Sequence, residues 1–168
     1  VGSPLISPDG VWVAYTVSTP ASPSAAGETR IWMVPAAGGD PIAMTAKGYS
    51  AGSPAWSPDG KYLSFIATRG DSAQAQVWVM DRRMGEGQQL TREKGGISGY
   101  GGSPDGTRLL HPIRDPDPGD TLPAHLKPKS APPWEVDRLQ FKRDGAGYLT
   151  GNQRTHLYVF DLATRETR

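Results

Sequence analysis

Cysteine is absent from the 168 residues, which excludes disulfide bonds and thiolate chemistry. An excess of one charge is also lacking, because 18 basic and 17 acidic residues leave a formal charge of +1. This balance predicts neither nucleic-acid binding nor attachment to a membrane surface. No apolar run approaches the roughly 20 residues of a membrane-spanning helix. The first ten residues have neither the basic start nor the apolar core of a signal peptide, which favours a cytoplasmic location.

Three copies of the tetrapeptide Ser-Pro-Asp-Gly divide the chain. They begin at Ser7, Ser57 and Ser103, so the repeat spacings are 50 and 46 residues. Each copy is typical of a reverse turn between strands, because proline presets φ and glycine accepts the positive φ that closes the bend. A spacing of this size indicates a propeller, a solenoid or another array of repeated units.

The segments around the first two turns match element by element. The predicted strands lie at 3–6, 11–17, 30–34 and 41–45 in the first unit, and at 53–56, 61–66, 76–81 and 88–91 in the second. Valine, tryptophan and tyrosine at this density favour strands over helices. Trp32 matches Trp78, and the closing Thr45 matches Thr91, so we interpret the aromatic residues at repeat positions as core. The sequence therefore predicts two four-stranded antiparallel meanders, about 3–45 and about 53–91.

The third unit, about 99–168, departs from this pattern before its turn. Gly101 and Gly102 stand where the second unit has Ala55 and Trp56, so the large apolar anchor is missing. The sequence alone gives no reason for this loss.

The strands after the third turn are also irregular. His111-Pro112 is expected to interrupt the next strand, because proline cannot donate a hydrogen bond to a central ladder. The strand that matches the tryptophan strand comes only at 156–161. The fourth strand is expected beyond Arg168.

Roughly thirty residues have been inserted into the third unit, at about 115–150. The first part, 115–133, is dominated by proline, aspartate and lysine and predicts an exposed loop. The second part alternates apolar and polar residues over 136–142. With a turn at 143–145, it predicts a small extra hairpin.

A meander cannot bury both of its faces alone, so neighbouring units must stack face to face. Four-stranded units of this length fit propeller blades, which typically number about four to eight. The predicted fold class is therefore all-β, a partial propeller of about three blades with the third irregular. Three blades do not close such a ring, so we expect a piece of a longer protein or a partner in a homo-oligomeric ring.

One match to a catalytic motif is interpreted as structural. Residues 48–52 fit G-x-S-x-G, the nucleophile elbow of α/β-hydrolases, in which the serine lies between a strand and a helix. Pro54 and Pro58 follow closely and disfavour a helix there, so the segment is predicted to connect two blades. The histidines have no metal-ligand spacing, and Asp115, Asp117 and Asp120 lack the glycine of a calcium loop. Neither a cofactor nor a metal site is predicted.

The segment 55–65 resembles the WD-like repeat of TolB and of prolyl oligopeptidase propellers. Residues 137–145, followed by 155–161, resemble more narrowly the propeller of bacterial acylaminoacyl-peptidase-like members of the prolyl oligopeptidase family. The resemblance implies a propeller that gates and orients short peptides over its own α/β-hydrolase domain, which carries a Ser-Asp-His triad. That domain would lie outside this chain, so no catalytic residue is expected in it. The alternative is a TolB-like scaffold that binds protein partners and performs no chemistry.

The candidate substrate-binding residues lie in or beside the insertion, where a repeat protein can place function without disturbing its core. They are Arg138, Arg143, Arg154 and Trp134. Guanidinium groups bind carboxylates through paired hydrogen bonds, so clustered arginines could hold a peptide terminus or an acidic side chain. The other interpretation is a solvated strand face on which Asp137 and Asp144 pair with these arginines. Trp134 has no repeat equivalent, so it could face a ligand.

Overall fold

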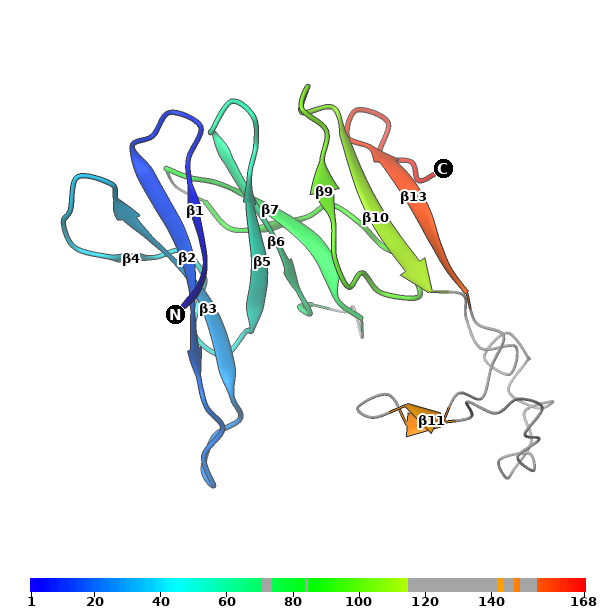
Figure 1. Cartoon of the computed structure of the whole chain (residues 1–168), viewed down its shortest axis with the longest axis horizontal. Coiled ribbons are helices and arrows are strands. Elements are labelled where there is room, and N and C mark those ends of the chain that lie inside the picture. Colours follow the sequence, from blue (N-terminus) through cyan, green and yellow to red (C-terminus); the bar gives the residue numbers. More distant parts are fainter. Residues whose placement is uncertain (71–73, 84, 115–141, 144–146, 149–153) are drawn as a thin grey trace. The chain divides into compact units, whose positions relative to one another are not determined.

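The computed structural model describes residues 1–70, 74–83, 85–114, 142–143, 147–148 and 154–168. Strands joined by turns account for the regular structure, and no helix occurs within those ranges. Of the four antiparallel sheets in those ranges, the three larger ones follow one another in chain order (Figure 1). The predicted all-β, propeller-type fold with an irregular third blade is confirmed.

The first two sheets are regular four-stranded meanders, here called blade 1 and blade 2. Blade 1 consists of β1 (Gly2–Ile6), β2 (Trp12–Thr19), β3 (Glu28–Pro35) and β4 (Ile42–Ala43), and blade 2 of β5 (Ala51–Trp56), β6 (Tyr62–Ala67), β7 (Gln76–Asp81) and β8 (Gln88–Gln89). Their registers agree, since Tyr15 pairs with Trp32 and Phe65 with Trp78. The closing threonines also agree. Thr45 Oγ1 accepts a hydrogen bond from the Ile31 N–H, and Thr91 Oγ1 accepts one from the Val77 N–H, both at 3.0 Å.

Blade 3 combines two strands that are neighbours in sequence with a third that is distant from them. Its strands are β9 (Gly101–Gly102), β10 (Arg108–Arg114) and β13 (Thr155–Asp161), in the order β13-β10-β9. After β13 the chain turns back, and Val159 and Arg168 exchange two backbone hydrogen bonds of 2.9 Å each. Thr167 and Phe160 form an isolated antiparallel bridge at this edge of the sheet. The described residues contain no fourth strand of blade 3, so the fourth strand expected beyond Arg168 stays a prediction.

Pro112 does not interrupt β10, contrary to the sequence prediction. Backbone groups of alternate residues point to the same side of a strand, and Arg108 O accepts a hydrogen bond from the Ser103 N–H on the β9 side. Pro112, four residues beyond Arg108, therefore has its backbone nitrogen on that side too. However, β9 ends its pairing where Leu110 meets Gly101. No ladder bond is lost because the partner strand is too short to reach the proline.

Residues 114–156 form a compact unit separate from 1–113 and 157–168. Its described part is the antiparallel pair β11 (Lys142–Arg143) and β12 (Gly147–Tyr148). The predicted hairpin is thus present, but Arg143 belongs to a strand rather than to the predicted turn, because it pairs with Gly147. The rest of the predicted strand, 136–141, and the loop at 115–133 lie outside the described residues.

The Ser-Pro-Asp-Gly turns are held by one repeated hydrogen-bond pattern. In blade 1 the Ser7 hydroxyl donates to Asp9 Oδ1 at 2.5 Å and accepts from the Trp12 N–H at 2.9 Å. The pKa of Asp9 is lowered to about 2, chiefly by the hydrogen bond from Ser7 and next by the one from Arg82. The corresponding bonds in the other turns are Ser57 to Asp59 at 2.6 Å and Ser103 to Asp105 at 2.5 Å. Because these contacts are local, each turn forms without help from another blade.

The three turns lie in a row at one end of the sheets (Figure 1). A Cβ built on Gly60 would lie 3.4 Å from Pro8 Cδ, and one on Gly106 would lie 3.3 Å from Pro58 Cδ. Both glycines also have positive φ, +66° and +69°. The glycine of each turn therefore closes its own bend and leaves room for the proline of the preceding turn.

The buried core lies between neighbouring blades. Between blades 1 and 2 it contains Ala14, Ile31, Ala51, Leu63, Phe65, Ala67 and Met80, and between blades 2 and 3 it contains Val77, Ile97, Leu109 and Phe160. The interpretation of the repeat-position tryptophans as core is only partly right. Trp32 and Trp78 are half-buried, and only Trp78 packs against one of these clusters. Because side chains alternate along a strand, Trp32 lies on the face of β3 opposite the buried Ile31.

Candidate functional site

The predicted substrate-binding residues belong to the separate unit 114–156. Trp134 and Arg138 lie outside the described residues. Arg143 is placed only through its backbone pairing in β11. Arg154 is exposed directly before β13. A carboxylate-binding cluster of these side chains therefore stays a prediction.

The G-x-S-x-G segment leads from a loop into a strand. The Ser50 hydroxyl accepts a hydrogen bond from the Thr29 N–H at 3.2 Å, and β5 begins at the next residue. The Gly48 N–H donates to Glu28 Oε1 at 2.9 Å, which ties the same segment to β3. The segment connects two blades, as the prolines that follow it indicate. It does not have the strand–helix setting in which a serine acts as nucleophile.

Metal sites and membrane-spanning helices are absent from the part of the chain that the structure describes. No group of three or more His, Asp and Glu side chains there is arranged to hold a metal ion. No helix there has the length and apolar character needed to cross a bilayer.

The interface between blades 1 and 2 is closed by an indole. Trp56, at the end of β5, packs against the core of this interface. Its Nε1–H donates to Leu5 O of blade 1 at 3.2 Å. Near the turns, Arg82 Nη1 of blade 2 lies 2.6 Å from Asp9 Oδ2 of blade 1. A large ring and an ion pair thus bridge the two sheets.

Among the described residues, the interface between blades 2 and 3 has neither an indole nor an ion pair at the equivalent positions. Gly102 occupies the position of Trp56, and Leu162 occupies the position of Arg82. The Arg82 N–H donates to Lys61 O and the Leu162 N–H donates to Thr107 O, both at 3.0 Å, which establishes that these two positions are equivalent. The side-chain change therefore occurs on an unchanged backbone.

Tyr100 and Ser64 replace the missing indole as the polar link. The Tyr100 hydroxyl lies 3.0 Å from Ser53 O and 2.8 Å from Ser64 Oγ, both in blade 2. Burial raises the pKa of Tyr100, so this hydroxyl stays protonated. Ser64 Oγ donates in turn to Ala55 O at 3.0 Å. Ala55 O is the repeat equivalent of Leu5 O, so a serine hydroxyl supplies the bond that an indole supplies in the other interface.

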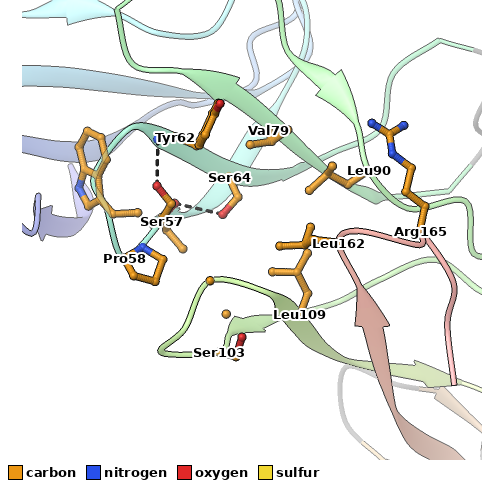
Figure 2. Close-up of a pocket in the computed structure, with 14 residues that line it drawn as sticks. Ser57, Pro58, Tyr62, Ser64, Val79, Leu90, Ser103, Leu109, Leu162 and Arg165 are labelled. Atoms are coloured by element: carbon orange, nitrogen blue, oxygen red, sulfur yellow. Dashed lines mark hydrogen bonds between the residues drawn. The ribbon is translucent and has the colours of Figure 1, made fainter.

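This substitution leaves a cavity of about 410 Å³ between blades 2 and 3 (Figure 2). Its apolar lining includes Trp56, Pro58, Val79, Leu90, Leu109 and Leu162. Leu109 and Leu162 of blade 3 face Ser64, Val79 and Leu90 of blade 2 across it. Arg165 is the sole charged residue among those that line it. Sequence reasoning noticed the glycines but could not find the cavity, because Leu162 is about sixty residues from Gly102.

His111 is a second feature that the sequence did not identify as unusual. It is 0% exposed and occupies the position of Phe65 in blade 2. Its ring lies against Tyr158, with centroids 6.4 Å apart, and no residue that the structure describes forms a hydrogen bond with either nitrogen. Burial lowers the pKa of His111, although the charge of Glu93 opposes this. The imidazole therefore acts as an aromatic packing group in its neutral form.

Arg69 is the third such feature, on the outer part of the interface between blades 1 and 2. Its guanidinium lies over the rings of Tyr49, Phe65 and Trp78 at 5.5, 5.2 and 5.8 Å. Among the described residues, none accepts a hydrogen bond from its buried Nε or Nη2, and burial lowers the pKa of Arg69. Cation–π attraction to three rings offsets part of this desolvation.

The fold defines a class: the chain is a β-propeller segment whose blades pack face to face. Comparison with solved structures agrees. The chain superposes on an acylaminoacyl peptidase of Pyrococcus horikoshii with a TM-score of 0.72 and 22% identity, covering 99% of this chain and 24% of that one. TolB of Acinetobacter baumannii gives 0.61 and 18% over 99% of this chain and 31% of that one. These likenesses establish the fold alone.

The sequence relatives are peptidases. The chain is 33% identical over 153 residues to the uncharacterized peptidase YuxL of Bacillus subtilis, covering 90% of this chain and 23% of that protein. It is 32% identical over 111 residues to dipeptidyl-peptidase 5 of Porphyromonas endodontalis, covering 66% of this chain and 16% of that protein. No family model matches. The chain thus spans less than a quarter of either relative, and the predicted resemblance to a peptidase propeller is confirmed.

Proposed function

We propose that this chain is the portion of a peptidase propeller that limits access and orients short peptides over a separate α/β-hydrolase domain of the prolyl oligopeptidase type. The observation that carries the proposal is the 33% identity over 90% of the chain to a protein named as a peptidase. The likeness of the fold to an acylaminoacyl peptidase is consistent with it.

The local structure at Ser50 supports placing the hydrolytic reaction outside this chain. Peptide hydrolysis by a serine needs a nucleophile, a base within hydrogen-bond reach and an oxyanion site. Ser50 instead accepts a bond from a backbone N–H in a blade connection. We therefore assign binding and positioning to this chain and the chemistry to the hydrolase domain.

The alternative is a TolB-like scaffold that binds protein partners. Likeness to TolB is at the level of fold, at 18% identity, whereas both sequence relatives are peptidases. The peptidase function is therefore the better supported of the two.

The direct test uses the natural full-length protein. We expect it to hydrolyse a short N-acylated chromogenic peptide and to be inactivated by a serine-directed fluorophosphonate. Ser50→Ala should leave kcat/KM unchanged, because Ser50 is structural. The proposal fails if the protein hydrolyses neither acylated nor free short peptides, or if Ser50→Ala abolishes activity.

The arginine hypothesis has its own test in the same assay. If Arg138, Arg143 and Arg154 hold a substrate carboxylate, Arg143→Ala should lower kcat/KM by about tenfold for peptides with a free carboxy terminus. Peptide amides should be affected less. Arg83→Ala is the matched control, because this exposed arginine pairs with Asp81 of its own blade. Equal kinetics for Arg143→Ala and Arg83→Ala would remove Arg143 from the site.

A further inference from the structure

The internal repeat shows what belongs in the space between blades 2 and 3. In the preceding interface the equivalent position carries Trp56, whose ring packs between the two sheets. Gly102 carries no side chain, and a Cβ built there would lie 4.0 Å from Leu109 Cδ2, an ordinary contact distance. The cavity is therefore the place of a missing aromatic ring.

The walls of this cavity suit a ring from another molecule. Its volume of about 410 Å³ falls in the range of about 300–1,000 Å³ typical of ligand pockets. Leu109 and Leu162 form one wall, and Val79 and Leu90 form the wall across from it (Figure 2). Burying an apolar ring between such walls removes its surface from water, which is the main source of affinity for a ligand of this kind.

The hydrogen bonds of the site define the kind of ring. In the first interface Leu5 O accepts the indole N–H. Here the equivalent Ala55 O already accepts from Ser64 Oγ, and the Tyr100 hydroxyl lies within 2.8 Å of the same serine. Among the described residues that line the cavity, no buried side-chain polar atom lacks a partner. A ring that carries an N–H or O–H would have to share Ala55 O with the Ser64 hydroxyl, whereas a hydrocarbon ring needs no acceptor.

We propose that the cavity between blades 2 and 3 binds the phenyl ring of a peptide's phenylalanine side chain. We assign the ring to a peptide because a protein side chain, that of Trp56, fills the equivalent place between blades 1 and 2. A hydrocarbon ring is preferred to an indole because it needs no acceptor, whereas an indole would have to share Ala55 O with the Ser64 hydroxyl. The site is distinct from the predicted arginine cluster and does not depend on hydrolysis, so its test is a binding measurement.

The experiment measures binding of N-acetyl-phenylalanine amide to the natural protein by saturation-transfer NMR and titration. For a probe of this size we expect a Kd on the order of 1 mM. N-acetyl-tryptophan amide should bind more weakly. Gly102→Trp should abolish binding, because the new side chain fills the cavity as Trp56 fills the preceding interface.

Two leucine variants keep the proposal falsifiable if Gly102→Trp does not fold. Leu162→Ala removes part of the cavity wall and should raise the Kd about fivefold. Leu110→Ala is the matched control, since Leu110 is 43% exposed and does not line the cavity. The proposal is overturned if the natural protein does not bind the probe or if the tryptophan probe binds more tightly. It is also overturned if Gly102→Trp folds and still binds, or if the two leucine variants behave alike.

Discussion

The two blade interfaces share a backbone plan and differ in the side chains that close them. In both, the proline of one Ser-Pro-Asp-Gly turn packs on the glycine of the next. Between blades 1 and 2, Trp56 and the Asp9–Arg82 ion pair complete the contact. Between blades 2 and 3, Tyr100 does so through blade 2 groups, and a cavity remains.

The difference teaches that backbone stacking and side-chain filling are separate requirements of this fold. The stacking needs only small local groups, so all three turns keep it. Filling the interface needs a large side chain, and the second interface has Gly102 at the position where the first has a tryptophan. An interface whose polar groups are hydrogen-bonded but whose side chains leave empty space can hold a ligand in that space.

The largest effect should come from the core of the first interface. Phe65 is 0% exposed, so Phe65→Ala should lower the free energy of unfolding by about 3–5 kcal/mol, measured by urea unfolding followed by circular dichroism. His111→Ala, at the equivalent position, should cost less than half as much. The imidazole is smaller and its polar nitrogens gain water on unfolding. Equal losses would contradict the distinction between the two interfaces.

Trp56→Ala should make the first interface resemble the second. Because Trp56 is half-buried, the loss should be about 2–4 kcal/mol, with Leu5 O losing its indole partner. Val11→Ala, in an exposed turn position, is the control and should change stability little. A crystal structure of Trp56→Ala should show a new cavity between blades 1 and 2. A collapsed interface there would refute the comparison.

Tyr100→Phe tests the polar closure of the second interface. The variant keeps the ring and removes the hydroxyl near Ser53 O and Ser64 Oγ, so about 1 kcal/mol should be lost. Tyr62→Phe is the matched control, since this tyrosine is 47% exposed. If both variants unfold at the same urea concentration, the Tyr100 hydroxyl does not link the blades.

His111→Phe should alter how stability depends on pH. Burial lowers the pKa of His111 below its ordinary 6.5, so the unfolded chain binds a proton first as pH falls. The stability that neutral His111 provides is therefore full above about pH 7. It declines from about pH 6.5 down to the lower pKa of the folded state. Urea midpoints from pH 5 to 8 should show this decline in the natural protein and a smaller one in His111→Phe. Identical profiles would place the titration elsewhere.

The smallest effect should come from the ion pair of the first interface. Arg82→Ala removes the contact with Asp9, and because both side chains are partly exposed the fall in Tm should be small and should disappear at about 1 M salt. Arg83→Ala, whose partner Asp81 is in the same blade, should have no measurable effect. A large fall that persists at high salt would indicate that Arg82 acts by packing.

Sequence reasoning succeeded where the determinant is local. The serine and aspartate of each turn bond within five residues, so their tetrapeptides identified the turns and the strands beside them. It failed at Pro112, since the harmlessness of a proline depends on how far the neighbouring β9 extends. It also failed for the tryptophans at repeat positions, since whether each one packs against a core cluster depends on the neighbouring blade, as Trp32 and Trp78 show.

By itself the sequence determined the repeated blade, because turn chemistry and strand alternation act over a few residues. Only the tertiary structure decided what fills each interface. Arg82 meets Asp9 across 73 positions of sequence, and Tyr100 meets Ser53 across 47. Such partners have no fixed spacing that a pattern could reveal. The loss of one indole became a cavity because the side chains that meet there from distant parts of the chain, among them Leu109 and Leu162, leave its volume unfilled.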